Sequence, residues 1–543
     1  MNATRLAFPV FLVVALITYF PTIGAGFVYD FAGWQKEYEA GSFADIINCF
    51  GYKGNHQVLH LFFYSFYKLF HIAGWPWYLL FTALHAVNAW LLFTWIRRSL
   101  VSTRGNVTWI AGLTSLLFLI HPYSIEVVVW KVCLHYLLSM TAILGLLLVQ
   151  ETYMREGRRG LMYSAMAIYG ASLFLLELSF VTPVLIALWL GIQALGTSRE
   201  SVWYLRGFTL TGSLFGLLAL YLLLNRFTLG AWIGHYGASA HLSFDFIGIV
   251  STELKYLVKH LFAARYYSFG AKGWLFDQIL SNPTVVFTFL AILVSGIVWF
   301  VLKRTTYSAG MRFAWFGLLA SMLYVLPVSN LYFYHLGVGM NDRYGYVPVA
   351  FLCLMLAGLF TRMPRILAYA LAIALILVHL PLQQRTIRYW QQSTEVLSGL
   401  KADFRWHDRD PVFILSSPDN YKGIVMTSIV NEPSGIHELI DYQTDRPFPG
   451  EMYDILQINM NDPMEGVRVE QTGPMQLKVT PTQWGNWWHR NGIGASGYEN
   501  DLYKVELLDY PYLVTFKQLP PGSAIIYPDS MRWKEFVLQP WPQ

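Results

Sequence analysis

The sequence predicts a polytopic α-helical membrane protein, with about eleven transmembrane helices followed by a β-rich extramembrane domain. Hydrophobic residues make up 55% of the 543 residues and charged residues only 13%, which is about half the charged share of a typical soluble protein. Apolar stretches near the length needed to span about 30 Å of hydrocarbon recur until about residue 380. Beyond that point charged and turn-forming residues become frequent.

The predicted spans are separated by short loops. Leu6–Ile23 could be mistaken for a cleaved signal peptide, but only Arg5 precedes it as a charge and no clear cleavage site follows, so we expect a retained helix. The eleven expected spans are Leu6–Ile23, Trp75–Trp95, Val107–Ile120, Val127–Val149, Leu161–Leu176, Phe180–Leu195, Gly207–Leu224, Thr284–Leu302, Phe313–Leu326, Tyr346–Phe360 and Ile366–Leu380.

Basic residues in the short loops predict the orientation, because cytoplasmic loops are enriched in Lys and Arg. The clusters fall on one side of the membrane if the N-terminus is cytoplasmic. Eleven spans then place the C-terminal domain outside, in the periplasm of a Gram-negative cell, with the chain in the inner membrane. The clusters are Arg97, Arg98 and Arg104; Arg155, Arg158 and Arg159; Arg199 and Arg206; Lys303 and Arg304; and Arg362 and Arg365.

The outer segment between the seventh and eighth spans departs from this charge pattern. Its piece Phe246–Phe262 is amphipathic, with Lys255 and Lys259 on one face, and predicts an interfacial helix. Its cations either anchor the chain at the lipid headgroups or receive an anionic lipid phosphate. The cations of the segment are Arg226, Lys255, Lys259, Arg265 and Lys272.

The C-terminal part predicts a separate β-rich α/β domain, Gln383–Gln543, after a transmembrane domain of residues 1–382. Strand-forming runs such as Pro411–Leu415 and Tyr512–Phe516 are bounded by Pro, Asp and Gly. Charged and turn-forming residues become more frequent in this part, as in Ser416–Asn420 and Asn431–Pro433.

Several classes of function are disfavoured by composition. The net charge of +5 is spread over loops, so nucleic-acid binding is not expected. Cys49, Cys133 and Cys353 are too few and too scattered for a disulfide framework or a zinc site. His56 and His60 have helical spacing but no evident third ligand, so no metal site is predicted, although a divalent cation stays open as a cofactor.

Acidic residues mark the outer ends of the predicted helices, and charges at the membrane edge are functional candidates. Asp30 follows the first span in an aromatic setting that would raise its pKa toward that of a general base. The competing interpretation is a helix cap in a polar loop. Asp45 is a second acid in the same loop.

Glu126 lies in the outer turn between the third and fourth spans, opened by His121 and Pro122. The helix macrodipole favours an acid in that first turn and alone could account for it. Lys131 and His135 follow at i, i+4 on an apolar helix. Such a pair is more often a polar contact between helices than a catalytic dyad.

Two further outer turns carry charge. Glu177 separates the fifth and sixth spans, and Asp342 with Arg343 precedes the tenth. A guanidinium at a helix N-terminus is disfavoured by the dipole unless it meets an anion.

Taken in order, these motifs resemble the GT-C superfamily of polyprenyl-phosphate-sugar-dependent glycosyltransferases, and above all its protein O-mannosyltransferase-like branch, which includes the transmembrane-and-TPR mannosyltransferases. The resemblance covers some 350 residues through the order of its motifs. They are an acid after the first helix; His56-Gln57-Val58-Leu59-His60; Trp77 to Ala89; His121-Pro122-x-x-x-Glu126; Glu177; Asp342-Arg343-Tyr344-x-Tyr346-x-Pro348; and Ser417-Pro418-Asp419-Asn420-Tyr421-Lys422-Gly423.

This resemblance implies an inverting hexosyltransferase that moves a sugar from a polyprenyl-phosphate donor to a hydroxyl of a glycan, lipid or protein acceptor. Asp30 would be the catalytic base, Glu126 would support substrate binding, and Arg343 would hold the donor phosphate. Further phosphate candidates are Lys255, Lys259, Arg265 and Arg226. Further substrate-site candidates are Asp45, His56, His60, His121, Glu177 and Asp342.

The chain departs from the family pattern in two ways. Relatives often carry two adjacent acids after the first helix, whereas Phe31 follows Asp30 here, which makes Asp45 the candidate to compensate. The repeats of the eukaryotic branch are also missing. Two alternatives therefore stay open: a transporter or flippase for a lipid-linked or anionic solute, and a GT-C-like scaffold without activity.

Overall fold

The computed structural model divides the chain into two compact units. The first contains Met1–Ile23 and Ser42–Thr386, and the second contains Gly24–Gly41 and Ile387–Gln543. The sequence predicted a single boundary at residue 382 and therefore placed Gly24–Gly41 in the first domain, whereas the structure places this segment in the second unit. The residues described are 3–48, 55–100, 107–195, 200–233, 245–303, 307–329, 338–427, 435–482, 497–508 and 510–541. Cys49, Arg104, Arg199, Arg304 and the segment Asn431–Pro433 lie outside them.

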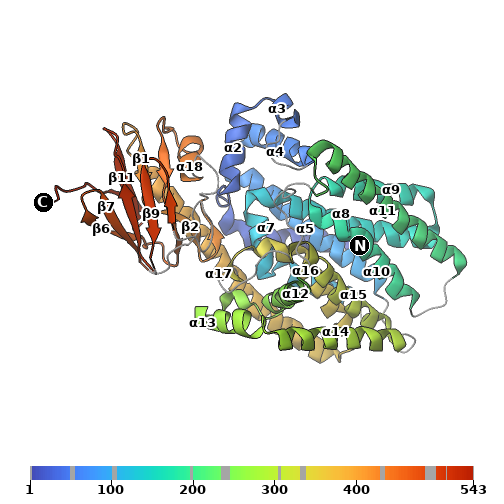
Figure 1. The fold of residues 1–543 in the computed structure, drawn as a ribbon. Helices are drawn as coiled ribbons and strands as arrows, with labels where there is room; N and C mark the ends of the chain where they lie inside the picture. The colour runs from blue at the N-terminus through green and yellow to red at the C-terminus, as the bar shows by residue number, and fades with distance from the viewer. Residues whose placement is uncertain are drawn as a thin grey trace. The chain divides into compact units, whose positions relative to one another are not determined.

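The first unit is a helical bundle (Figure 1). Its last helix, α17, continues beyond Thr386 into the second unit. The helices are α1 Ala3–Tyr19, α3 Phe43–Asn48, α4 Gln57–Phe70, α5 Gly74–Ser99, α6 Val107–Leu119, α7 Ile125–Val129, α8 Leu134–Glu156, α9 Arg159–Leu173, α10 Thr182–Ala194, α11 Ser201–Leu229, α12 Phe246–Leu261, α13 Phe269–Lys272, α14 Pro283–Leu302, α15 Ala309–Leu323, α16 Tyr346–Phe360 and α17 Arg365–Asp403.

Within the described residues, 8 helices are long and apolar enough to cross a membrane, or up to 9 if α6 and the bent segment Pro122–Val129 form one span. All eleven predicted stretches contain helix, but α9 has 15 residues and the apolar part of α1, Leu6–Thr22, falls in the shorter class. Large apolar side chains cover the outside of α14, where Ile292 is 67% and Leu302 74% exposed. Such a surface fits lipid better than water.

Helices α15 and α16 pack closely because glycines face each other's backbone. A Cβ on Gly317 would lie 2.4 Å from the Met355 nitrogen, and one on Gly358 would lie 2.5 Å from the Ala314 nitrogen. Small residues allow this approach between membrane helices. The contact fixes α16, whose first residue follows the Asp-Arg-Tyr-Gly segment.

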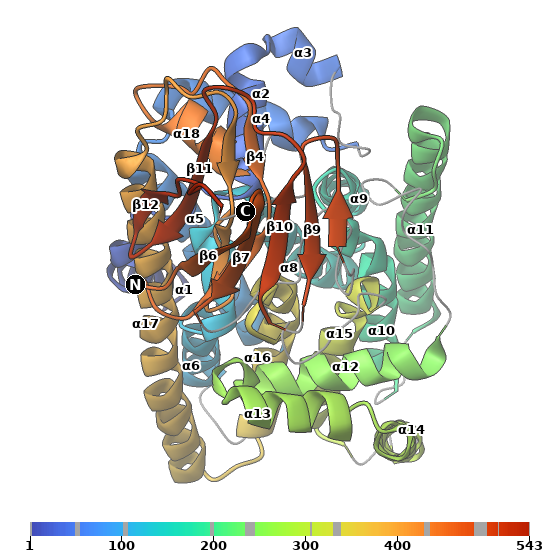
Figure 2. The same ribbon diagram turned by 60° about the vertical axis from the view of Figure 1, so that its left-hand side comes forward.

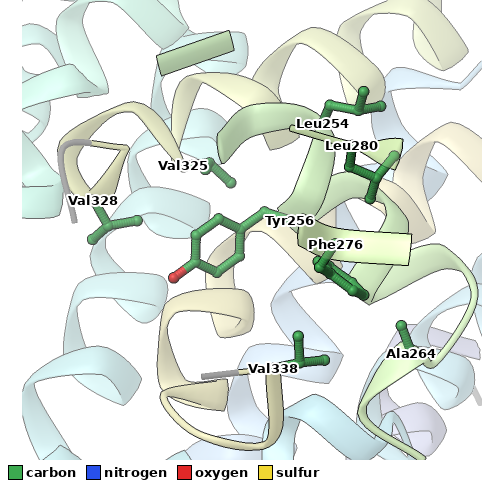
Figure 3. Close-up of a cluster of buried hydrophobic side chains, with 8 residues drawn as sticks. All are labelled: Leu254, Tyr256, Ala264, Phe276, Leu280, Val325, Val328 and Val338. Atoms are coloured by element: carbon green, nitrogen blue, oxygen red, sulfur yellow. The ribbon is translucent and has the colours of Figure 1, made fainter. Parts of the chain in front are cut away.

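Helix α12 has 16 residues and, as predicted, is not among the helices that could span a membrane. An apolar cluster holds it against the bundle, and the Tyr256 ring extends from α12 toward Val325 and Val328 (Figure 3). The cluster consists of Leu254, Tyr256, Ala264, Phe276, Leu280, Val325, Val328 and Val338.

The second unit is β-rich, as predicted, and its strands form three sheets (Figure 2). The sheet orders are β12-β11-β1-β4, β6-β7-β10-β9-β8 and β3-β2-β5. Strand β1 is parallel to β4 and β11, and β2 is parallel to β5. The strands are β1 Val412–Ile414, β2 Ser417–Tyr421, β3 Ile424–Val425, β4 Met452–Asp454, β5 Gln457–Met460, β6 Val467–Gly473, β7 Gln476–Pro481, β8 Gly497–Glu499, β9 Tyr503–Leu507, β10 Tyr512–Phe516, β11 Ala524–Asp529 and β12 Arg532–Glu535.

The predicted strands at Pro411–Leu415 and Tyr512–Phe516 are confirmed as β1 and β10. Most of the segment Ser416–Asn420, despite its turn-forming residues, belongs to the buried strand β2. Its polar side chains are satisfied inside the domain: Ser417 Oγ donates to Asp454 Oδ2 at 2.6 Å, and Asn420 Nδ2 donates to Asp419 Oδ2 at 2.7 Å.

Two helices of this unit lie against each other, α2 Asp30–Ala40 and α18 Gly435–Gln443. Two glutamine side chains, one from each helix, bind backbone carbonyls of the other helix or of the segment before it. Gln35 Nε2 donates to the Tyr442 carbonyl at 2.6 Å, and Gln443 Nε2 donates to the Phe27 carbonyl at 2.8 Å. The segment after the first helix is therefore anchored to the C-terminal domain.

Asp454 predicts an unusual pH dependence in this domain. Burial, with the nearby Asp419 charge, raises its pKa to about 8 against the hydrogen bond from Ser417. Neutral Asp454 makes its whole contribution to folding stability at a pH below the pKa that it has in the unfolded chain. That contribution is lost as the pH rises toward 8, by at most about 1.4 kcal/mol per pH unit.

We therefore expect Asp454→Asn, which cannot ionise, to raise the melting temperature of the full-length protein more at pH 8 than at pH 5. Exposed Asp501→Asn is the matched control and should show no such trend. A pH-independent effect of Asp454→Asn would contradict the prediction.

Candidate functional site

The start of α16 carries a buried ion cluster. Asp342, in the short helical turn η9 Asp342–Gly345, lies 2.9 Å from Lys259 Nζ and forms a second ion pair with Arg265. The side chains of all three residues are at most 3% exposed. Lys259 Nζ also donates to the Met340 carbonyl at 2.9 Å. Lys259 is thus not a headgroup anchor, and that interpretation of it is wrong: the Asp342 carboxylate draws it into the protein.

Glu126 and Arg343 form the neighbouring pair. Arg343 Nη1 donates to Glu126 Oε1 at 2.7 Å, while the backbone nitrogens of Asp342 and Arg343 donate to Glu126 Oε2 at 2.6 and 3.3 Å. Glu126 therefore satisfies the N–H groups at the start of η9, the turn that leads into α16, as well as the guanidinium. The Glu126 carboxylate is thus the anion that offsets the unfavourable position of the Arg343 guanidinium at a helix N-terminus.

Aromatic rings surround the Arg343 guanidinium. Its Cζ lies 5.0 Å from the ring centroid of Trp130 and 4.9 Å from that of Tyr344, which is cation–π geometry. Arg343 is the most accessible charge here, at 19% exposure against 8% for Glu126. A ligand therefore reaches Arg343 before it reaches Lys259 or Arg265.

The charges of the cluster do not balance. Glu126 and Asp342 supply two negative charges, whereas Lys259, Arg265 and Arg343 supply three positive ones, which leaves a surplus of one. Buried charge is costly unless compensated. The surplus favours an anionic ligand at the accessible end.

Neighbouring groups hold the cluster in shape. Tyr123 Oη donates to the Lys259 carbonyl at 2.7 Å, and His121 Nδ1 accepts from the Tyr123 nitrogen at 3.3 Å. His260 faces Gly345 so closely that a Cβ there would lie 2.5 Å from its Nε2. His121 is buried, and in these contacts it caps the turn.

A second polar group joins α4, α8 and the turn before α10. His56 Nε2 lies 3.5 Å from Glu177 Oε1, and His56 Nδ1 lies 3.4 Å from the Phe174 carbonyl. Burial lowers the pKa of His56, but the hydrogen bond and charge of Glu177 outweigh it and raise that pKa overall. His135 on α8 lies within electrostatic reach of His56, Glu177 and Arg343.

His60 is buried one helical turn after His56, as the spacing predicted. Lys131 lies 5.3 Å from the centroid of the Phe81 ring on α5, a contact between helices. No group of three His, Cys, Asp or Glu within the described ranges is arranged to hold a metal ion.

Three other candidates make local contacts. Asp45 is exposed and exchanges hydrogen bonds with Ser42 at the start of α3. Arg226 is exposed at the end of α11 and donates to the Gly230 carbonyl. The Asp277 charge acts on Lys255, whose pKa burial lowers.

Asp30 is exposed at the first position of α2. The preceding Tyr29 has φ of 57°, a left-handed conformation that is costly for a residue with a Cβ. Asp30 belongs to the second unit, whereas Glu126 and Arg343 belong to the first.

Sequence reasoning missed Trp130, Tyr344 and Tyr123 as parts of the site. Spacing offered one signal, because Trp130 follows Glu126 by four residues and so falls on the same helical face. No match to this chain was found among protein-family models, curated proteins or solved structures.

Proposed function

We propose that this protein is an inverting glycosyltransferase that acts on the outer face of the inner membrane and is built on an eleven-span GT-C-like scaffold. It moves a sugar from a polyprenyl-phosphate donor to an acceptor hydroxyl. The observation that carries the proposal is the partly exposed Arg343 at the end of a cluster with surplus positive charge. A lipid phosphate matches that charge, and a membrane-embedded protein is suited to a lipid-linked donor.

The chemistry requires a base and an anion site. The family resemblance assigns the base to Asp30, which takes the proton of the acceptor hydroxyl, whose oxygen attacks the anomeric carbon from the face opposite the phosphate. The bond between that carbon and the phosphate oxygen breaks, and its electron pair stays on the phosphate. Arg343 stabilises the charge that develops there, and Asp30 then releases its proton to water.

The remaining cluster residues have supporting roles. Glu126 holds the guanidinium of Arg343 through a hydrogen bond of 2.7 Å. Asp342 already engages Lys259 and Arg265, so these two cations position the start of α16 rather than bind the donor first.

Arg343→Ala should weaken binding of polyprenyl-phosphate donor about 10–100-fold, because a charge-assisted contact contributes about 1.5–3 kcal/mol. Arg343→Lys should restore it only in part, since lysine lacks the planar fork. The measurement is donor affinity of the purified protein in nanodiscs.

Arg226→Ala, which removes an exposed arginine on α11, is the matched control and should bind donor normally. Unchanged affinity in Arg343→Ala would move the phosphate site to the segment from Lys255 to Arg265.

We expect the C-terminal domain to lie outside the cytoplasm, because the Lys and Arg clusters of the short loops select that orientation. An alkaline phosphatase fused after Gln543 should be active, and green fluorescent protein at the same position should be dark. The opposite pattern would overturn the orientation and, with it, the outer-face site.

A further inference from the structure

The phosphate chemistry does not use a second group of polar side chains, His56, Glu177 and His135, and the Arg343 charge acts on His135. His56 and Glu177 are 12% and 24% exposed, so both are reachable by a ligand, as Arg343 is. By contrast, the Asp342, Lys259 and Arg265 side chains are almost fully buried. His56 and Glu177 are thus accessible to a ligand, whereas the ion pairs around Asp342 are not.

His135 is the member of this group on which the Arg343 charge acts. It stands in the first turn of α8, and the charges of His56, Glu177 and Arg343 all act on its ring. Its Nδ1 is buried and makes no hydrogen bond of good geometry within the described part of the chain, although the ring lies within reach of the Val132 backbone. A buried polar atom of this kind is costly unless a ligand or water satisfies it.

The donor's own chemistry says what would lie there. A sugar joined to phosphate through one oxygen must sit next to any side chain that binds the phosphate. Its hydroxyl groups both donate and accept hydrogen bonds. The Glu177 carboxylate accepts hydrogen bonds, and the His135 ring can donate or accept them.

We propose that His56, His135 and Glu177 form the subsite that recognises the hydroxyl groups of the donor hexose, next to the phosphate at Arg343. This inference rests on the proposed function. Glu177 accepts from a sugar hydroxyl, and His56, whose Nε2 lies 3.5 Å from Glu177 Oε1, holds that carboxylate in place. His135 Nδ1 gains a well-formed hydrogen bond when the sugar is bound.

The test compares two lipids on the full-length protein in nanodiscs: polyprenyl phosphate without sugar and polyprenyl-phosphate mannose. The wild type should bind the mannose-bearing lipid more tightly. Glu177→Gln and, separately, His135→Ala should each reduce this sugar-dependent gain about tenfold while leaving affinity for the bare lipid unchanged. Arg343→Ala should weaken both lipids.

Glu151→Gln is the matched control, because Glu151 is a partly buried acid that accepts from Ser99 on α5 instead. A second sugar, polyprenyl-phosphate glucose, shows whether the subsite discriminates between hexoses, and loss of discrimination in Glu177→Gln supports it. An unchanged gain in both Glu177→Gln and His135→Ala would overturn the subsite but leave the phosphate site standing. If the wild type bound neither lipid, the proposed function would fail and the subsite with it.

Discussion

Asp30→Asn is expected to lower sugar transfer about 10²–10⁴-fold, the usual contribution of a positioned general base. The amide is nearly isosteric with the carboxylate but cannot take the acceptor proton. Asp30 is exposed on α2, which Gln35 and Gln443 anchor, so the fold and donor affinity should survive. The measurement is transfer from a purified polyprenyl-phosphate-sugar to a native acceptor extract, with melting temperature recorded for each variant.

Two variants sharpen this test. Asp30→Glu should recover little activity, because the longer side chain displaces the oxygen from the acceptor hydroxyl. Asp45→Asn tests the other acid that follows the first predicted span, and so shows which of the two acids is the base. Asp45 forms local hydrogen bonds with Ser42 at the start of α3, so its loss should leave transfer intact.

The outcomes separate the competing functions. Full turnover in a folded Asp30→Asn protein would refute Asp30 as the base. If Asp45→Asn alone were inactive, the base would move to Asp45. If neither variant changed anything and the wild type transferred no sugar, the transporter or the inactive scaffold would replace the glycosyltransferase.

Asp342→Asn should lower the free energy of unfolding by about 3–5 kcal/mol, the usual result of removing one partner from a buried ion pair. Asparagine keeps the shape but removes the negative charge between Lys259 and Arg265, whose side chains are at most 3% exposed. The readout is the melting temperature of the purified protein in detergent.

Charge balance predicts a rescue. Adding Lys259→Met to Asp342→Asn removes one of the stranded cations and should restore much of the lost stability, since buried pairs can be replaced by apolar groups at little cost. Glu156→Gln breaks an exposed pair with Arg158 and should change stability by only about 0.5 kcal/mol. Equal effects of Asp342→Asn and Glu156→Gln would refute the buried cluster.

Much of the fold could be predicted from sequence because its signals are local. An apolar run such as Thr284–Leu302 must be helical in lipid, where each backbone polar group needs a partner within its own segment, and α14 occupies Pro283–Leu302. Tyr512–Phe516 likewise became β10 from its strand-forming residues. Local composition does not explain the strand at Ser417–Tyr421, where turn-forming residues form β2 with buried partners such as Asp454.

The candidate site divides in the same way. The sequence alone identified Glu126, Glu177, Asp342 and Arg343, because charges beside apolar helices stand out. Only the tertiary structure decided their partners, since Glu126 and Arg343 are 217 residues apart in the chain and nothing local specifies the pair. It also decided that Lys259 is buried on Asp342 instead of facing headgroups, because the carboxylate offers a charge partner that compensates its removal from water. The same physics assigned the segment of Asp30 to the C-terminal unit: two glutamine side chains bind backbone carbonyls more than 400 positions away, and no sequence pattern encodes such a distant bond.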